Sequence, residues 1–216
     1  MKSCIYGLLA GLLLLSSGSI HAETDLSAEQ ARELVAEFVR KVTSYQADFA
    51  QVLIDEGGDI QDEESGTLWL QRPGQFYWHY LTPWERQIVS DGETVWLYDS
   101  ELEQVTVRSA GAALQSSPAA LLVGDLSALE GYRYSGVESA GGSTTVTLRP
   151  AGGDGDFDAV ELGFSNGLLQ RLVLLDKFRQ RTVVTLSDIA INPELDEAIF
   201  SFDIPEGADV IDQSGG

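Results

Sequence analysis

The chain has 216 residues, and its 34 aspartates and glutamates outnumber its 13 lysines and arginines, which gives a formal net charge of −21 at pH 7. A field of this sign repels phosphate backbones and anionic head groups, so the composition argues against nucleic acid as a partner and against electrostatic adsorption to an anionic membrane. One cysteine and two histidines leave too few ligands for a zinc site, and we expect no metal and no cofactor.

Residues 1–22 have the three-part layout of a secretory signal peptide. A basic residue precedes a short apolar run, and small residues end at Ala22. The run is too short to span a bilayer, although a short membrane anchor is the alternative interpretation. We therefore expect a single domain over residues 23–216. Because Cys4 lies in the signal segment, this domain has no cysteine, and its predicted compartment is the bacterial periplasm.

An amphipathic helix is predicted over residues 27–44. Ser27 is placed to cap its N-terminus, and Gln30 follows three residues later, as in a capping box. Apolar residues recur at helical spacing and form one stripe that is expected to pack against a sheet. The stripe consists of Leu34, Val35, Phe38, Val39 and Val42.

From residue 46 onward the sequence alternates between polar and apolar residues in short segments separated by turn residues. This period of two predicts strands, and the pair Asn166–Gly167 favours a tight hairpin turn. The pattern predicts a meander of antiparallel strands and a protein that is mainly β with some α. The eleven predicted strands cover residues 46–55, 65–71, 75–81, 86–90, 94–99, 103–108, 132–138, 143–149, 157–164, 168–176 and 179–189.

Two further elements are predicted outside this meander. A short apolar helix containing Leu121 and Leu122 is expected over residues 118–123, because Pro118 suits a first helical position. A last short strand is expected over residues 198–203, and the chain after it is expected to fray, although Val210 and Ile211 could dock.

The stretch from Trp69 to Trp96 holds all four tryptophans of the chain. Along the strand predicted here, Phe76, Trp78 and Tyr80 share one face. The opposite face is also partly apolar, so the sheet must curve around something or be covered. Two interpretations remain open: the helices fill the concave face as an ordinary core, or helices and sheet enclose a pocket for an apolar ligand.

Catalysis is the competing interpretation of function. The sequence contains no Walker loop and no dinucleotide fingerprint. Carboxylate pairs leave no spacing rule that a sequence can test. A hydrolase or another enzyme that uses an Asp/Glu pair in a sheet cleft is therefore the alternative.

Four motifs in the tryptophan-rich stretch carry a more specific signal. They are G-x-L-W-x-x-R-P-x-x-F-x-W from Gly66, P-x-x-x-x-I-V-S-D-G from Pro83, then V-W-x-Y-D and E-Q-V-T-V. Together they resemble the signature of the periplasmic outer-membrane lipoprotein carrier family (LolA). Weaker similarity extends over almost the whole chain after the signal segment.

The resemblance implies an incomplete, unclosed antiparallel β-barrel with helices as a lid over a hydrophobic cavity. It implies a carrier rather than an enzyme, which receives acylated lipoproteins from an inner-membrane ABC transporter complex and passes them to an outer-membrane lipoprotein receptor. We expect it to act as a monomer. The receptor is itself a lipoprotein, and the position of Cys4 argues against that relative, because it is not placed to become a lipid-modified first residue.

The resemblance also assigns roles to two residues. In the family, the arginine of the R-P pair bonds to the lid backbone and keeps the empty cavity closed, and this arginine corresponds to Arg72. The aromatic residue three positions after the proline, here Phe76, lies by the cavity mouth. Without the resemblance, the ordinary role of Arg72 is a surface ion pair with an acidic neighbour. The candidate ligand-binding residues are Arg72, Phe76, Trp78, Trp69, Trp96, Val35, Phe38, Val39, Leu121 and Leu122.

Overall fold

A computed structural model provides the structure of the chain. The predicted signal peptide and Leu121 lie outside the residues that it describes. Within the described residues, no helix is both long and apolar enough to cross a membrane. The described residues are 23–111, 122–123, 129–139, 142–152, 157–214.

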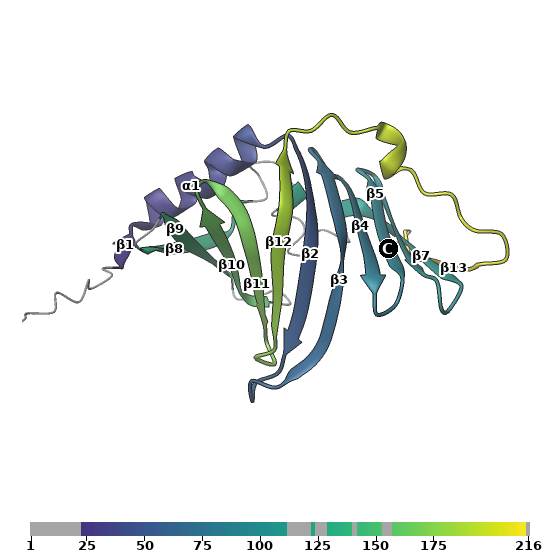
Figure 1. Cartoon of the computed structure of the whole chain (residues 1–216), viewed down its shortest axis with the longest axis horizontal. Coiled ribbons are helices and arrows are strands. Elements are labelled where there is room, and N and C mark those ends of the chain that lie inside the picture. Colours follow the sequence, from purple (N-terminus) through teal and green to yellow (C-terminus); the bar gives the residue numbers. More distant parts are fainter. Residues whose placement is uncertain (1–22, 112–121, 124–128, 140–141, 153–156, 215–216) are drawn as a thin grey trace, which may run out of the picture.

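The described strands form one curved sheet that does not close (Figure 1). Across the sheet, the strands are β1 (Thr24–Leu26), β8 (Tyr132–Ser139), β9 (Ser143–Pro150), β10 (Phe157–Ser165), β11 (Leu168–Asp176), β12 (Arg181–Ile191), β2 (Ser44–Ile54), β3 (Ile60–Gln71), β4 (Gln75–Thr82), β5 (Arg86–Asp91), β6 (Thr94–Asp99), β7 (Gln104–Ser109) and β13 (Asp209–Asp212). All eleven predicted strands are present, as β2 to β12. β12 pairs with β2, and the edge strands β1 and β13 do not meet, so the expected incomplete barrel is confirmed.

The helix α1 (Ala28–Lys41) confirms the predicted capping box. The backbone amide of Gln30 donates to Ser27 Oγ at 3.2 Å, and the amide of Ser27 donates to Gln30 Oε1 at 2.9 Å. The helix ends three residues earlier than predicted, because Val42 is already extended. α1 packs against β8, β9 and β1.

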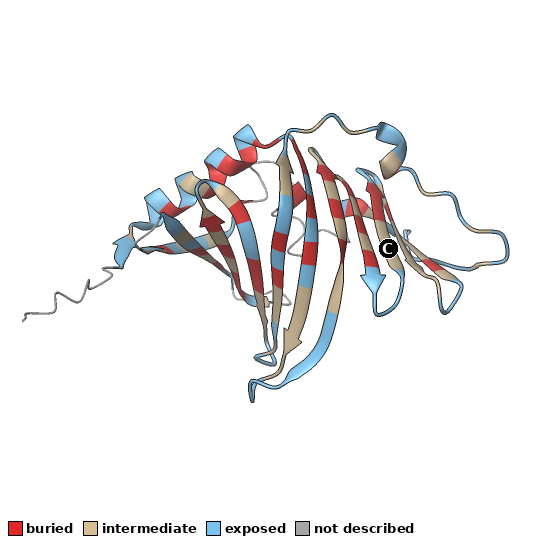
Figure 2. Cartoon of the chain, viewed as in Figure 1, coloured by how far each residue is buried: buried red, intermediate tan, exposed pale blue. Residues whose placement is uncertain are grey.

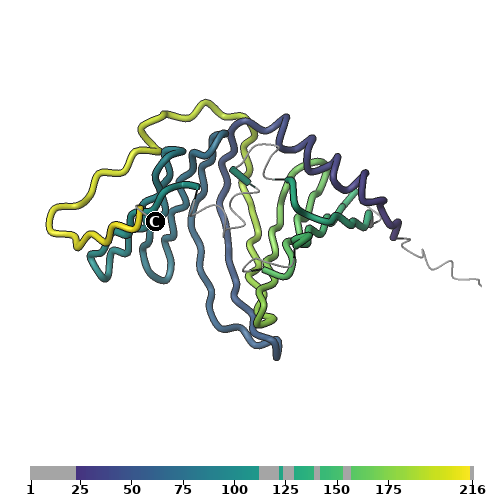
Figure 3. The backbone as a smooth tube through the Cα atoms, turned by 180° about the vertical axis from the view of Figure 1, so that it is seen from behind, coloured from purple at the N-terminus to yellow at the C-terminus, as the bar shows by residue number. Residues whose placement is uncertain are grey.

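The C-terminal segment differs from the prediction. The expected strand over residues 198–203 is wrong: Glu197–Phe200 form a 3-10 helix, η2, because Asp196 caps it and accepts from the backbone amide of Ala198 at 3.0 Å. The chain does not fray after it: Val210 and Ile211 dock, as the alternative had it, because β13 pairs in parallel with β7. Figures 1 and 3 show this segment leaving β12 and crossing to the far edge of the sheet, and η2 contacts β4 and β5 on the way.

The sheet has two distinct apolar faces. We call the face that carries α1 the inner face and the opposite one the outer face. The inner face holds the main core, in which the Phe38 ring of α1 meets Tyr45 at 6.3 Å and Phe164 at 5.7 Å between ring centroids. The outer face is covered over β5 to β7 by the C-terminal segment, where Phe202 lies 6.2 Å from Trp96. Figure 2 shows buried residues in the middle of most strands and exposed ones at the far end of β3 and in the turn that joins it to β2.

Candidate functional site

Aromatic side chains of β4 form the centre of the inner face. Phe76, Trp78 and Tyr80 are all buried there, as the alternation of strand residues predicts. Phe49 of β2 packs edge-on against Trp78 at 5.3 Å and against Tyr80 at 5.0 Å. We call Phe49, Phe76, Trp78 and Tyr80 the aromatic wall: the rings of Phe49, Trp78 and Tyr80 contact one another, and Phe76 extends the same face of β4. Its members come from β2 and β4, which are not neighbours in the sheet.

Two of the predicted site residues lie on the outer face instead. Trp69 stacks on Tyr77 at 5.3 Å, and Trp96 stacks on Phe202. Both are displaced by one position from the inner-face residues of their strands, and side chains one position apart point to opposite sides of a sheet. Trp69 and Trp96 therefore do not face the same space as Phe76, and they are removed from the set of candidate ligand contacts.

The lid residues on α1 lie where they were predicted. Val35, Phe38 and Val39 are buried against the inner face. Leu122 belongs to the same core. Leu122 and Val123 are helical, and both lie within the second predicted helix, residues 118–123. The inner face is therefore covered by two segments that lie far apart in the sequence.

Arg72, which directly follows β3, joins both lid segments to the sheet. Its Nε donates to the carbonyl of Val42 at 2.9 Å, and its Nη1 donates to the carbonyl of Leu122. The guanidinium carbon also lies 5.4 Å from the centre of the Phe38 ring. Since Val42 caps the C-terminus of α1, its carbonyl is one that the helix leaves without an internal partner. Arg72 thus contacts both the C-terminal end of α1 and the described pair Leu122–Val123.

The backbone around Arg72 reinforces this connection. The amide of Arg72 donates to the carbonyl of Thr43 at 2.8 Å, and the amide of Gly74 donates to the carbonyl of Val123 at 2.9 Å. Burial lowers the pKa of Arg72 to about 10, which still leaves its guanidinium charged at neutral pH. A charged donor strengthens its hydrogen bonds to carbonyls, and the geometry favours a latch over a surface ion pair.

The lid does not seal the inner face completely. A pocket of about 410 Å³ lies between the C-terminal half of α1 and the turns at Gly142 and Gly167. Apolar side chains of the helix and of the sheet make up much of its wall, among them Phe38, which also contacts Arg72. Its apolar lining residues are Leu34, Phe38, Val42, Phe164 and Ile191.

Several inner-face residues were missed from the sequence. Leu68 and Leu70 of β3 pair with Trp78 and Phe76 of β4, and both leucines are 2% exposed. The alternation of side chains along β3 could have identified them, because residues on either side of Trp69 point to the opposite face of the sheet. Choosing the tryptophan because of its size selected the wrong face of β3.

Known proteins of one family match most of this chain. The profile described as outer membrane lipoprotein carrier protein LolA matches residues 40–203. A protein of Chromohalobacter salexigens named outer-membrane lipoprotein carrier protein is 43% identical over 186 residues, which are 85% of this chain and 87% of that protein. The chain belongs to the LolA family. A second relative with the same name, from Azotobacter vinelandii, is 38% identical over 94% of this chain and 98% of its own length.

Solved structures of the family's fold are similar at much lower identity. A LolA superfamily protein from Nitrosomonas europaea has a TM-score of 0.50 at 13% identity and covers 82% of this chain and 98% of its own. An uncharacterized conserved protein from Thermus thermophilus has a TM-score of 0.52 at 16% identity and covers 87% of this chain. At such identities the likeness shows the LolA-type sheet and lid, and nothing about cargo.

Proposed function

We propose that this protein is a periplasmic carrier of lipoproteins, which holds their acyl chains on the inner face beneath the lid. It accepts them from an inner-membrane ABC transporter complex and delivers them to an outer-membrane receptor. Residues 1–22 act as its signal peptide, and residues 23–216 form the carrier domain. We assign no catalytic residue, and the hydrolase alternative gains no support from the LolA relatives, which are named as carriers.

The observation that carries this proposal is a buried apolar face whose lid is fastened by polar bonds. Each methylene of an acyl chain gains about 0.8 kcal/mol when it leaves water, so a lipid anchor needs shielding to cross an aqueous compartment. A carrier must also let its cargo go. Bonds from Arg72 to Val42 and Leu122 form only when the lid is closed, so they offset part of the energy of lipid binding and favour release.

The replacement Arg72→Leu tests the latch. It removes two hydrogen bonds from a charged donor, each worth about 1.5–3 kcal/mol, and therefore shifts the lid toward its open state. We expect the variant to bind a neutral fluorescent probe, N-phenyl-1-naphthylamine, about tenfold more tightly or better. In a reconstituted system, lipoprotein should leave the inner membrane normally and accumulate on the variant.

Arg181→Leu is the matched control, because Arg181 is exposed on the outer face. This variant should bind the probe and deliver lipoprotein like the unmodified protein. Normal delivery by the Arg72→Leu variant to membranes that carry the receptor would rule out the latch. A folded protein that binds no apolar probe would contradict the carrier function itself.

A further inference from the structure

The inner face changes abruptly from apolar to polar along one row of residues. Gln51 of β2 pairs with Glu64 of β3, and Arg86 of β5 pairs with Asp99 of β6, which in turn pairs with Gln104 of β7. The first four lie two residues from an inner-face apolar or glycine residue of the same strand, and Gln104 lies two residues from Thr106, so all five occupy one side of the sheet. We call this set the polar row. Beyond it, β2 and β3 continue into an exposed hairpin (Figure 2).

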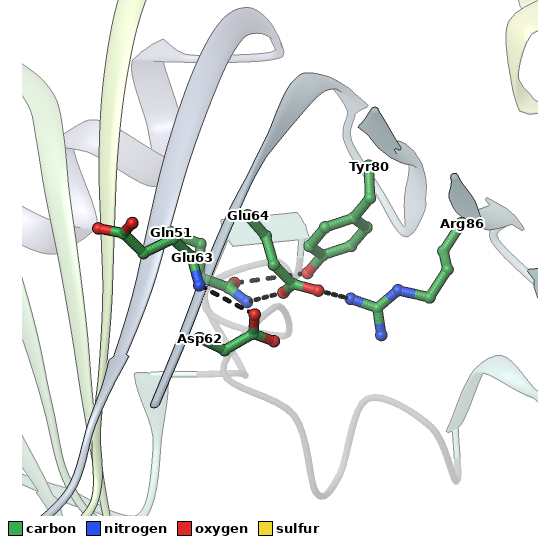
Figure 4. Close-up of polar contacts among 6 residues, drawn as sticks. All are labelled: Gln51, Asp62, Glu63, Glu64, Tyr80 and Arg86. Atoms are coloured by element: carbon green, nitrogen blue, oxygen red, sulfur yellow. Dashed lines mark hydrogen bonds and ion pairs between the residues drawn. The ribbon is translucent and has the colours of Figure 1, made fainter. Parts of the chain in front are cut away.

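Glu64 and Arg86 form the centre of the polar row (Figure 4). The carboxylate of Glu64 accepts from Nη2 of Arg86 and from Nε2 of Gln51, the latter at 2.5 Å. The Glu64 side chain is only 11% exposed, whereas Arg86 is 40% exposed. The guanidinium also lies 4.6 Å from the centre of the Tyr80 ring, at the end of the aromatic wall. Arg86 is therefore held in place from two sides while part of it stays accessible.

A cleft of about 230 Å³ opens beside Arg86 on the side of β5 to β7. Its wall combines apolar side chains with the polar ends of Gln104 and Thr106. A guanidinium carries five N–H donors, and the bond to Glu64 uses a single nitrogen atom, Nη2. The other N–H donors of Arg86 therefore lie beside the apolar side chains of this cleft. The lining includes Tyr80, Arg86, Ile88, Leu97, Gln104 and Thr106.

The distance from the lid to the polar row is comparable to the length of an acyl chain. Tyr45 and Gln51 lie on the same face of β2, six residues apart, which corresponds to about 20 Å at a rise of about 3.3 Å per residue. One leaflet of a bilayer holds acyl chains in about 15 Å, half of its hydrocarbon core. A chain of this length that lies along the strands with its methyl end under α1 therefore brings its polar end to within about 5 Å of the row that contains Arg86.

The charges favour a neutral ligand group at this position. Glu64 neutralises Arg86, Asp99 adds a further carboxylate to the row, and the whole chain has a net charge of −21. A phosphate would meet this negative field, whereas an ester carbonyl is a neutral acceptor that needs a donor once it leaves water.

We propose that Arg86, positioned by Glu64 and assisted by Gln104, binds the ester carbonyls that join the acyl chains of a lipoprotein to its glyceryl group. This inference rests on the proposed carrier function and adds to it the place where the apolar part of the cargo ends. The apolar wall takes the chains, and the polar row fixes how deeply they enter.

Paired ligands and variants test this proposal. One ligand is a synthetic diacylglyceryl-cysteinyl peptide, and its match is the dialkyl ether that keeps the same chains and peptide but lacks the ester carbonyls. Affinities are measured by displacement of N-phenyl-1-naphthylamine. Arg86→Met should weaken binding of the ester about ten- to a hundredfold, as expected for one charge-assisted hydrogen bond, and should leave binding of the ether unchanged.

Arg181→Met is the control for loss of a positive charge, and it should change neither affinity. If Arg86→Met does not fold because Glu64 is left unpaired, the double variant Glu64→Gln, Arg86→Met removes both charges and is subject to the same expectation. An equal effect on ester and ether, or none on either, overturns the assignment of Arg86 while the carrier function stands. Failure of both ligands to displace the probe from the unmodified protein refutes the carrier function as well.

Discussion

A single methyl group added at Gly66 should disrupt the sheet at the centre of the aromatic wall. Gly66 lies in β3 where the register against β4 is irregular. A Cβ at this position would lie 1.9 Å from the carbonyl oxygen of His79 and 3.0 Å from Cε1 of Phe49. The first atom belongs to the backbone and cannot rotate away. Gly66→Ala therefore requires β3 and β4 to separate by about 1 Å, since Cβ contacts under 3.0 Å essentially never occur.

The cost follows from two contributions. Overpacking of a well-packed core typically costs about 1–3 kcal/mol. Each ladder hydrogen bond lost as β3 and β4 separate adds about 1 kcal/mol. We expect Gly66→Ala to lower the free energy of unfolding by about 3 kcal/mol, which corresponds to about 6–12 °C in Tm for a chain of this size. Because the new methyl group points at Phe49, probe binding to the inner face should weaken as well.

Urea unfolding followed by tryptophan fluorescence measures this loss. Gly111→Ala is the matched control, because no atom lies within 4 Å of a Cβ built there, and the free energy of unfolding should change by less than about 0.5 kcal/mol. A loss below about 1 kcal/mol for Gly66→Ala would refute the reasoning, because it would mean that β3 and β4 accommodate the methyl group without separating.

Two further predictions concern the polar row and the C-terminal segment. Burial raises the pKa of Glu64 and the charge of Arg86 opposes this, so an NMR titration should give a pKa above the ordinary value of 4.5, and a higher one in Arg86→Met. The stability that Glu64 contributes is then complete below its ordinary pKa and is lost as the pH rises toward the raised one; a lowered pKa would contradict this. Phe200→Ala should cost about 3–5 kcal/mol because Phe200 is 1% exposed, whereas Phe178→Ala, at a residue 81% exposed, should cost almost nothing in the same urea assay. Equal losses would show that η2 does not anchor the segment.

Local signals in the sequence account for most of the fold. The capping box at Ser27 defined the start of α1, and alternation with turn pairs located all eleven strands of the meander. β1 has three residues and is too short to show a period. The partner of β13 is β7, about a hundred residues earlier in the chain, and no local pattern encodes a parallel pairing at that distance.

The candidate site was predictable on each strand but not between strands. Alternation placed Phe76, Trp78 and Tyr80 together correctly, because they share one strand. Trp69 and Trp96 were assigned to the site from their size alone. Which face of the sheet they occupy depends on the register of β3 against β4 and of β6 against β5, and the sequence does not show that register. Glu64 and Arg86 are 22 residues apart, and only the folded sheet shows that they form a pair.

An open sheet has two free edges, and each edge offers unpaired backbone groups to any other extended chain. In this protein the edge strands are the two shortest, with three residues in β1 and four in β13. Asp25 lies in the first, and Asp209 and Asp212 lie at the ends of the second. Short, acidic edges are poor templates for edge-to-edge polymerisation. The sheet can therefore remain unclosed at high concentration without growing into fibres.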